Sequence, residues 1–87
     1  MNAQQIAAIQ LFTDRVTRYA RLSPDTWMNG PVVFKVEPHR AGPILFATNV
    51  TDELRWFETS IHIGVLVGPR GRMQILSCRG MRQDLLE

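Results

Sequence analysis

The sequence predicts a single α+β domain, in which an N-terminal amphipathic helix packs on a four-stranded, mainly antiparallel sheet. Apolar residues recur every three or four positions up to about residue 22, which is the period of a helix with one buried face. From residue 31 onward apolar and polar residues alternate, which is the period of a strand. Because 87 residues are too few for two hydrophobic cores, we expect residues 1–87 to form one domain.

The first element is a helix over residues 2–22. It ends before Pro24, because the residue that precedes a proline avoids the helical region. A short helical turn at residues 26–28 follows. The side chains that share the predicted buried face of the long helix are Ile6, Ile9, Phe12, Thr13, Val16, Tyr19 and Ala20.

Three strands are expected at residues 31–38, 43–50 and 56–67. Residues 51–54, between the last two, form either a turn or one turn of helix capped by Thr51. Strands that follow one another along the chain favour an antiparallel meander. Residues 80–87 are either a frayed tail or a short packed helix. In the first strand, Val32, Phe34 and Val36 share one face. The predicted core-facing side chains of the third strand are Phe57, Thr59, Ile61, Ile63, Val65 and Val67.

The meander ends in a long β-hairpin around the segment GPRGR at residues 68–72. Pro69 and Arg70 suit the centre of a type I turn, and Gly71 suits the left-handed position that follows it. This turn sets the register of the whole hairpin. The predicted cross-strand pairs are Val67 with Met73, Val65 with Ile75, Ile63 with Ser77, and His62 with Cys78.

Composition and cysteine usage narrow the class of protein. A hydrophobic content of 45% with 21% charged residues is typical of a globular domain and excludes a disordered chain. The single cysteine excludes an internal disulfide framework and a cysteine-cluster zinc site. The N-terminal residues lack the pattern of a signal peptide, and no apolar run is long enough to span a bilayer. We therefore expect a soluble cytoplasmic protein.

The sequence contains little that indicates a catalytic, metal or cofactor site. A thiol beside an imidazole, as the predicted pair of His62 and Cys78 would give, can form a nucleophile. No residue nearby suits the orienting group or the oxyanion hole that such a nucleophile needs. His39 and His62 fall on different elements, and the glycines match no phosphate-binding spacing, so no metal or cofactor is expected. The protein is predicted not to be an enzyme.

Exposed apolar side chains framed by arginines point to protein binding. Leu11, Arg15 and Arg18 form a stripe with Leu22 on the polar side of the helix. We expect Leu11, Trp56 and Leu66 to be apolar anchors, and Arg15, Arg18 and Arg55 to be the rim that selects the partner. Val33 and Leu45 also need cover beyond that supplied by one helix. The prediction is a protein–protein interaction module that forms a homodimer through a sheet face or edge and binds an unidentified protein.

Two alternatives stay open. Nine of the ten basic residues are arginines, a choice that a coding bias of the genome would also produce. A small nucleic-acid-binding protein would use the tip at residues 68–72, with Trp56 as a stacking platform and Arg70, Arg72, Arg79 and Arg82 as phosphate contacts. The weaker alternative is a small-ligand pocket between helix and sheet. The small size would also suit an accessory protein of a mobile genetic element.

Overall fold

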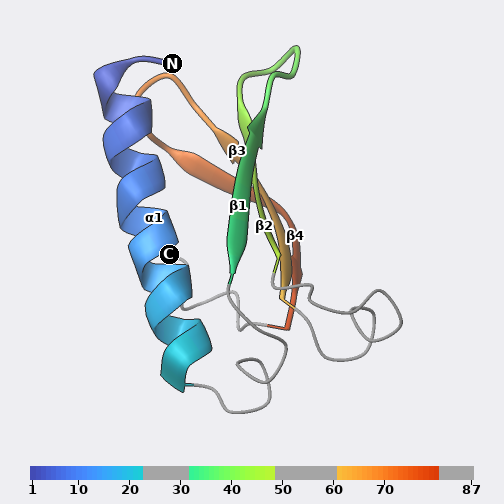
Figure 1. Cartoon of the computed structure of the whole chain (residues 1–87). Helices are drawn as coiled ribbons and strands as arrows, with labels where there is room; N and C mark the ends of the chain where they lie inside the picture. Colours follow the sequence, from blue (N-terminus) through green and yellow to red (C-terminus); the bar gives the residue numbers. More distant parts are fainter. Residues whose placement is uncertain (23–31, 49–60, 81–87) are drawn as a thin grey trace.

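A computed structural model describes residues 1–22, 32–48 and 61–80 of the chain. They form helix α1 (Ala3–Leu22) and strands β1 (Val33–Glu37), β2 (Ile44–Thr48), β3 (His62–Val67) and β4 (Met73–Arg79). The strands lie in the order β1-β2-β3-β4, and each neighbouring pair is antiparallel. The helix lies along one face of the sheet (Figure 1). The predicted α+β class and the meander are both confirmed.

Helix α1 begins with a reciprocal pair of hydrogen bonds. Asn2 Oδ1 accepts from the backbone N–H of Gln5 at 2.9 Å, and Gln5 Oε1 accepts from the backbone N–H of Asn2 at 2.9 Å. This capping box satisfies donors that the first turn would otherwise leave open. Gln5 occupies the inward position of this turn and is only 7% exposed. Ile6, expected on the buried face, is instead 46% exposed, because the inward position is taken by Gln5.

The hydrophobic core lies between α1 and the face of the sheet that it covers. The helix contributes Phe12 and Val16, and the buried side chains of the sheet are Leu45, Ala47, Ile61, Ile63, Val65 and Val67. Val32 and Phe34 pack against them, as the strand alternation predicts, whereas Val36 is 39% exposed. The expectation that Leu45 needs cover beyond the helix is wrong. Leu45 pairs with Val65, so both side chains share the covered face, and Leu45 is 1% exposed.

The tip of the β3–β4 hairpin has the predicted turn. The N–H of Gly71 donates to the carbonyl oxygen of Gly68 at 2.9 Å, and the N–H of Gly68 donates to the carbonyl oxygen of Arg72 at 2.7 Å. Gly71 has a φ of 82°, in the left-handed region that glycine adopts readily. The predicted pairs of Val67 with Met73 and Val65 with Ile75 are confirmed.

Beyond these pairs the predicted register is wrong. The pairing shifts between Gly64 and Val65, so that Leu76 is an extra residue on β4. Ile63 therefore pairs with Cys78 instead of Ser77, and His62 pairs with Arg79 instead of Cys78.

A close approach across the strands accompanies the shift. A Cβ atom at Gly64 would lie 3.0 Å from Ser77 Oγ and 3.5 Å from the nearest ring atom of Phe46. Glycine in a strand marks such close contacts and bulges, and the turn sequence alone does not encode them.

Several predicted segments lie outside the described residues. These are the turns at residues 26–28 and 51–54, the start of the third strand at residues 56–60, and the tail after residue 80. Within the described ranges, no helix combines the length and the apolar composition needed to cross a membrane.

Candidate functional site

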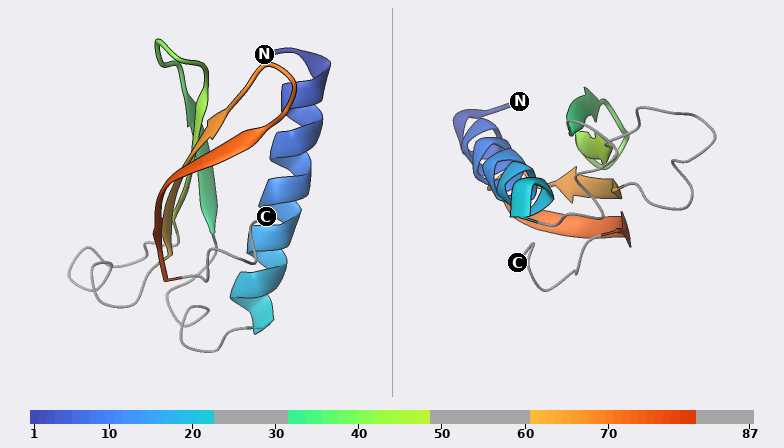
Figure 2. Two further views of the ribbon diagram at one scale, coloured as in Figure 1. Left: turned by 180° about the vertical axis from the view of Figure 1, so that it is seen from behind. Right: turned by 60° about the horizontal axis from the view of Figure 1, so that its bottom comes forward.

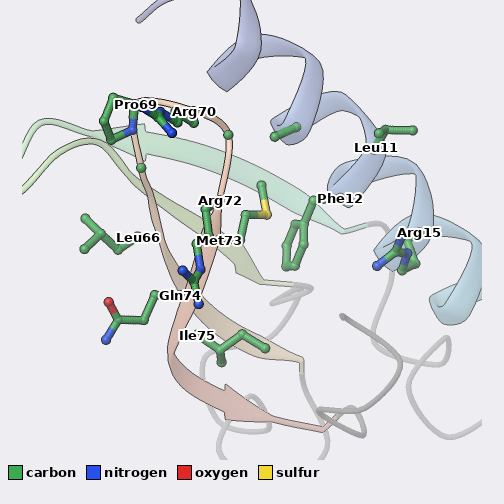
Figure 3. A pocket seen from close by; sticks show the side chains of 13 residues that line it. Leu11, Phe12, Arg15, Leu66, Pro69, Arg70, Arg72, Met73, Gln74 and Ile75 are labelled. Atoms are coloured by element: carbon green, nitrogen blue, oxygen red, sulfur yellow. The ribbon is translucent and has the colours of Figure 1, made fainter.

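An open groove of about 980 Å³ lies between α1 and the β3–β4 hairpin. Figure 3 shows Phe12 and Met73 in its middle, Arg15 on the helix, and Arg70 and Arg72 on the hairpin. The helix contributes Ala8, Leu11, Phe12 and Arg15, and the hairpin contributes Leu66, Gly68, Pro69, Arg70, Gly71, Arg72, Met73, Gln74 and Ile75.

The groove has an apolar floor that continues into the core. Phe12 is 3% exposed, and Met73 and Ile75 are half-buried side chains that pack against the core cluster. Leu11 stands beside this floor and is 67% exposed. A large aliphatic side chain that is exposed next to a buried aromatic one provides apolar area that a ligand could cover.

The hairpin tip is fixed to the first turns of α1. Asn2 Nδ2 donates to the carbonyl oxygen of Pro69 at 2.6 Å, and Gln5 Nε2 donates to the carbonyl oxygen of Val67 at 3.2 Å. A Cβ atom at Gly71 would lie 2.9 Å from the carbonyl oxygen of Gln4, so only a glycine fits this contact. Figure 2 shows the tip against the N-terminal end of the helix. One end of the groove is therefore closed by a supported wall.

The electrostatics of the groove are one-sided. Its lining includes the exposed side chains of Arg15, Arg70 and Arg72, and no described lining residue is acidic. A guanidinium group offers a planar set of donors that suits carboxylates and phosphates. An anionic ligand therefore matches this surface.

The structure brings together residues from two separate predictions. Leu11, Arg15 and Leu66, expected to bind a partner protein, share the groove with Arg70 and Arg72, expected to bind nucleic acid. The other proposed contacts that the structure describes, Arg18 and Arg79, are not part of it. Arg18 is exposed on α1 but does not line the groove, Arg79 is exposed at the far end of β4, and Arg55, Trp56 and Arg82 lie outside the described residues.

Apolar side chains are also exposed away from the groove, among them Val33 on the sheet face opposite α1 and Leu76 at the bulge of β4. Val33 is 57% exposed and Leu76 is 52% exposed. Gly64 also belongs to the sheet face opposite α1. The ring of Phe46 lies over it, and Gly64 is buried. Among the residues expected to need cover, Val33 does remain exposed.

The predicted juxtaposition of His62 and Cys78 is absent, because the bulge turns Cys78 toward the core side. Cys78 pairs with Ile63 and packs against the core cluster. Burial raises the pKa of the Cys78 thiol, which is opposite to the lowered pKa that an activated cysteine needs. Across the described part of the chain, no cluster of three or more histidine, cysteine or acidic residues is arranged to hold a metal ion.

Three residues that build the site were not singled out from the sequence. Met73 and Ile75 were recognised only as members of the hairpin register, although their alternation already placed them on the apolar face. Gln5 could have been found from its spacing, since Asn-x-x-Gln at a helix start is a variant of the capping box. Its bond to Val67 joins residues 62 apart, and no local pattern encodes such a contact.

No family model, curated protein or solved structure matches the chain.

Proposed function

We propose that the protein is a non-enzymatic protein-binding module that takes a segment of a partner protein into the groove between α1 and β4. The observation that supports this most directly is the exposed side chain of Leu11 beside the half-buried Met73 and Ile75. Protein interfaces commonly combine an apolar centre with a polar rim, and arginine is enriched in them relative to the rest of the surface. Arg15, Arg70 and Arg72 would supply that rim.

The same groove suits nucleic acid less well. Binding of a single strand relies on aromatic side chains on which bases stack, and the one aromatic side chain of the described lining, Phe12, is 3% exposed. Arg79, the further phosphate contact expected within the described residues, does not join the arginines of the groove. A small-ligand site normally encloses most of its ligand, whereas Leu11 at 67% exposure leaves this groove open.

Self-association remains part of the proposal, but we assign it to a different surface. A two-fold dimer through the groove would bring Arg15, Arg70 and Arg72 close to the same residues of the second copy. Like charges placed together oppose association. The sheet face opposite α1, where Val33 is exposed, also carries Arg79 and the ion pair of Lys35 with Glu37, and a dimer through this face would leave the groove free for a partner.

The test is selection from a random-peptide display library on the immobilised protein, with Leu11→Asp as the disrupting variant and Ile6→Asp as the matched control. Ile6 is 46% exposed on the same helix and does not line the groove. We expect the wild type and Ile6→Asp to enrich the same peptides, and Leu11→Asp to lose them. Circular dichroism establishes that all of the variants are folded.

Two results would overturn the proposal. One is the absence of any enriched peptide. The other is enrichment that Leu11→Asp leaves unchanged. If, instead, a mixed-sequence oligonucleotide binds and Arg70→Ala removes that binding, the nucleic-acid alternative takes the place of the proposal.

A further inference from the structure

We infer that the ligand of the groove is an extended, acidic segment of a partner protein that pairs with the outer edge of β4 as an additional strand. This inference rests on the proposed function, because it specifies the conformation and the charge of the segment that the groove would bind. It follows from the hydrogen bonds of the hairpin, from a comparison of the two sheet edges, and from the arginines around the groove.

The hydrogen bonds near the tip determine which backbone groups of β4 point outward. Gly68 donates to Arg72, whereas the N–H of Val67 points to the other side and donates to the carbonyl oxygen of Pro43 at 2.9 Å. Antiparallel pairs alternate between hydrogen-bonded and non-hydrogen-bonded residues. Val67–Met73 and Val65–Ile75 are therefore non-hydrogen-bonded pairs. The N–H and C=O groups of Met73 and Ile75 consequently point away from β3, toward an edge with which no described strand pairs.

The two edges of the sheet differ in their protection against strand addition. Edge strand β1 carries Lys35 and Glu37, whose side chains form an ion pair with an Nζ–Oε1 distance of 2.7 Å. Charged side chains on an edge strand discourage pairing with another chain. Edge strand β4 has a single charged residue, Arg79, at its last position, and it has none from Met73 to Cys78. Of the two edges, that of β4 is the one suited to strand addition.

This edge and the groove coincide. Met73 and Ile75 present their backbone groups at the edge, and their side chains line the groove with Leu11 and Phe12. A strand added here would direct every second side chain toward this apolar lining. Backbone pairing would provide affinity, and the alternating side chains would provide specificity. Because the bulge follows Ile75, the regular part of the edge is short, and a short segment suffices to fill it.

The charge of the ligand follows from the rim. Arg70 and Arg72 lie on the hairpin at the tip end of this edge, and no described lining residue is acidic. Carboxylates between the apolar side chains of the segment would form charge-assisted hydrogen bonds with these guanidinium groups. The segment that fits is therefore extended, with aliphatic residues alternating with aspartate or glutamate.

The experiment uses a fluorescein-labelled peptide of about seven residues, the length of a typical strand, in which leucine alternates with glutamate. Fluorescence anisotropy measures its binding to the full chain. N-methylation is then introduced at one backbone amide at a time. Added as a strand, the peptide has only alternate amides directed at β4. We expect methylation of these amides to weaken binding about tenfold, and methylation of the intervening amides to change it less than threefold.

Protein variants test the charge. We expect Arg70→Ala and Arg72→Ala to weaken binding at low salt and to reduce its dependence on salt, because each removes one ion pair. Arg40→Ala is the matched control, since Arg40 is exposed and does not line the groove. A peptide with lysine in place of each glutamate should not bind.

The outcomes separate the two proposals. If methylation of every backbone amide weakens binding to the same extent, the ligand is helical. This result overturns strand addition, but it is compatible with the proposed protein-binding groove. Equal binding of the glutamate and lysine peptides overturns the acidic specificity. If the selected peptides and the glutamate peptide both bind Leu11→Asp as tightly as the wild type, the groove is not the site and the proposed function fails as well.

Discussion

Substitution of Gly71 by alanine tests the contact between the hairpin tip and the helix. Gly71 combines a φ of 82° with a position against the first turns of α1. Position 71 must therefore lack a side chain for two reasons. One is the backbone conformation of the turn, and the other is the packing of the turn on the helix.

The two costs can be estimated separately. A residue other than glycine in the left-handed region costs roughly 1–2 kcal/mol. The new Cβ would lie 2.9 Å from the carbonyl oxygen of Gln4, so the tip and the helix must move apart. This movement disrupts the hydrogen bond from Gln5 to Val67, which contributes about 0.5–1.5 kcal/mol. The free energy of unfolding of Gly71→Ala should thus fall by about 2–3 kcal/mol, a large fraction of the roughly 4–13 kcal/mol typical of a domain of this size.

The assay is thermal unfolding followed by circular dichroism. For a domain of this size, the predicted loss corresponds to a decrease in Tm of about 8–24 °C. Gly71→Asn is the control, because asparagine tolerates the left-handed region but still introduces a Cβ atom. We expect it to be less destabilising than Gly71→Ala, yet clearly below the wild type. If the free energy of unfolding of Gly71→Asn is within about 0.5 kcal/mol of the wild-type value, the contact with the helix does not constrain this position and the prediction is wrong.

Further predictions concern the core, the helix cap and the thiol. Phe12→Ala should lower the free energy of unfolding, measured in urea, by about 3–5 kcal/mol because it leaves a cavity. Leu11→Ala should change this free energy by no more than about 0.5 kcal/mol. Similar values for the two variants would contradict the buried position of Phe12 and the exposed position of Leu11. Gln5→Ala should lower the free energy of unfolding by about 1–3 kcal/mol, since it leaves the carbonyl oxygen of Val67 without its donor. A Tm equal to that of the wild type would refute this. Because burial raises the pKa of the Cys78 thiol, less thiolate forms at a given pH than for a free cysteine. The Cys78 thiol should therefore react with an aromatic disulfide reagent more slowly than glutathione does at pH 8, and its reaction should accelerate only at higher pH. A rate above that of glutathione would contradict the raised pKa of this thiol.

The sequence predicts the elements of this fold well because their determinants are local. The change from helical to alternating periodicity near residue 31 lies between α1 and β1, and the segment GPRGR specifies the turn and the first pairs of the hairpin. Each of these signals lies within a few residues of the structure that it determines.

The register beyond Val65 could not be predicted in the same way. The shift at Gly64 occurs where Phe46 and Ser77 approach this position closely, and both residues come from other strands. A one-residue slip moves each following side chain to the opposite face. For this reason, the predicted pair of His62 and Cys78 failed although the turn was correct.

The candidate site was predicted as fragments, and only the three-dimensional structure assembles them. Leu11 and Arg15 were recognised on the helix, and Arg70 and Arg72 were recognised on the turn, but they were assigned to different partners. They meet in one groove because Gly71 docks on the first turns of α1. A contact between residues so far apart in the chain leaves no periodicity and no motif that a single sequence could show.

This docking also predicts how the groove depends on residues that no ligand would touch. Asn2 caps Gln5 and holds the carbonyl oxygen of Pro69, so it fixes both the helix start and the wall of the groove. Loss of a cap typically costs about 1 kcal/mol. We expect Asn2→Ala to weaken binding of the acidic peptide about fivefold, because part of the binding free energy must then order the groove.

The salt dependence of that binding separates preorganisation from direct contact. Asn2→Ala retains every arginine of the groove, so it should weaken binding equally at low and high salt, whereas Arg72→Ala should reduce the salt dependence itself. Thr13→Ala is the matched control, because the Thr13 hydroxyl donates only to the nearby carbonyl oxygen of Gln10 within the same helix. If Asn2→Ala binds as tightly as the wild type, the groove does not need its fixed wall. If Asn2→Ala alters the salt dependence, Asn2 acts through the charges of the site and not through the order of its wall.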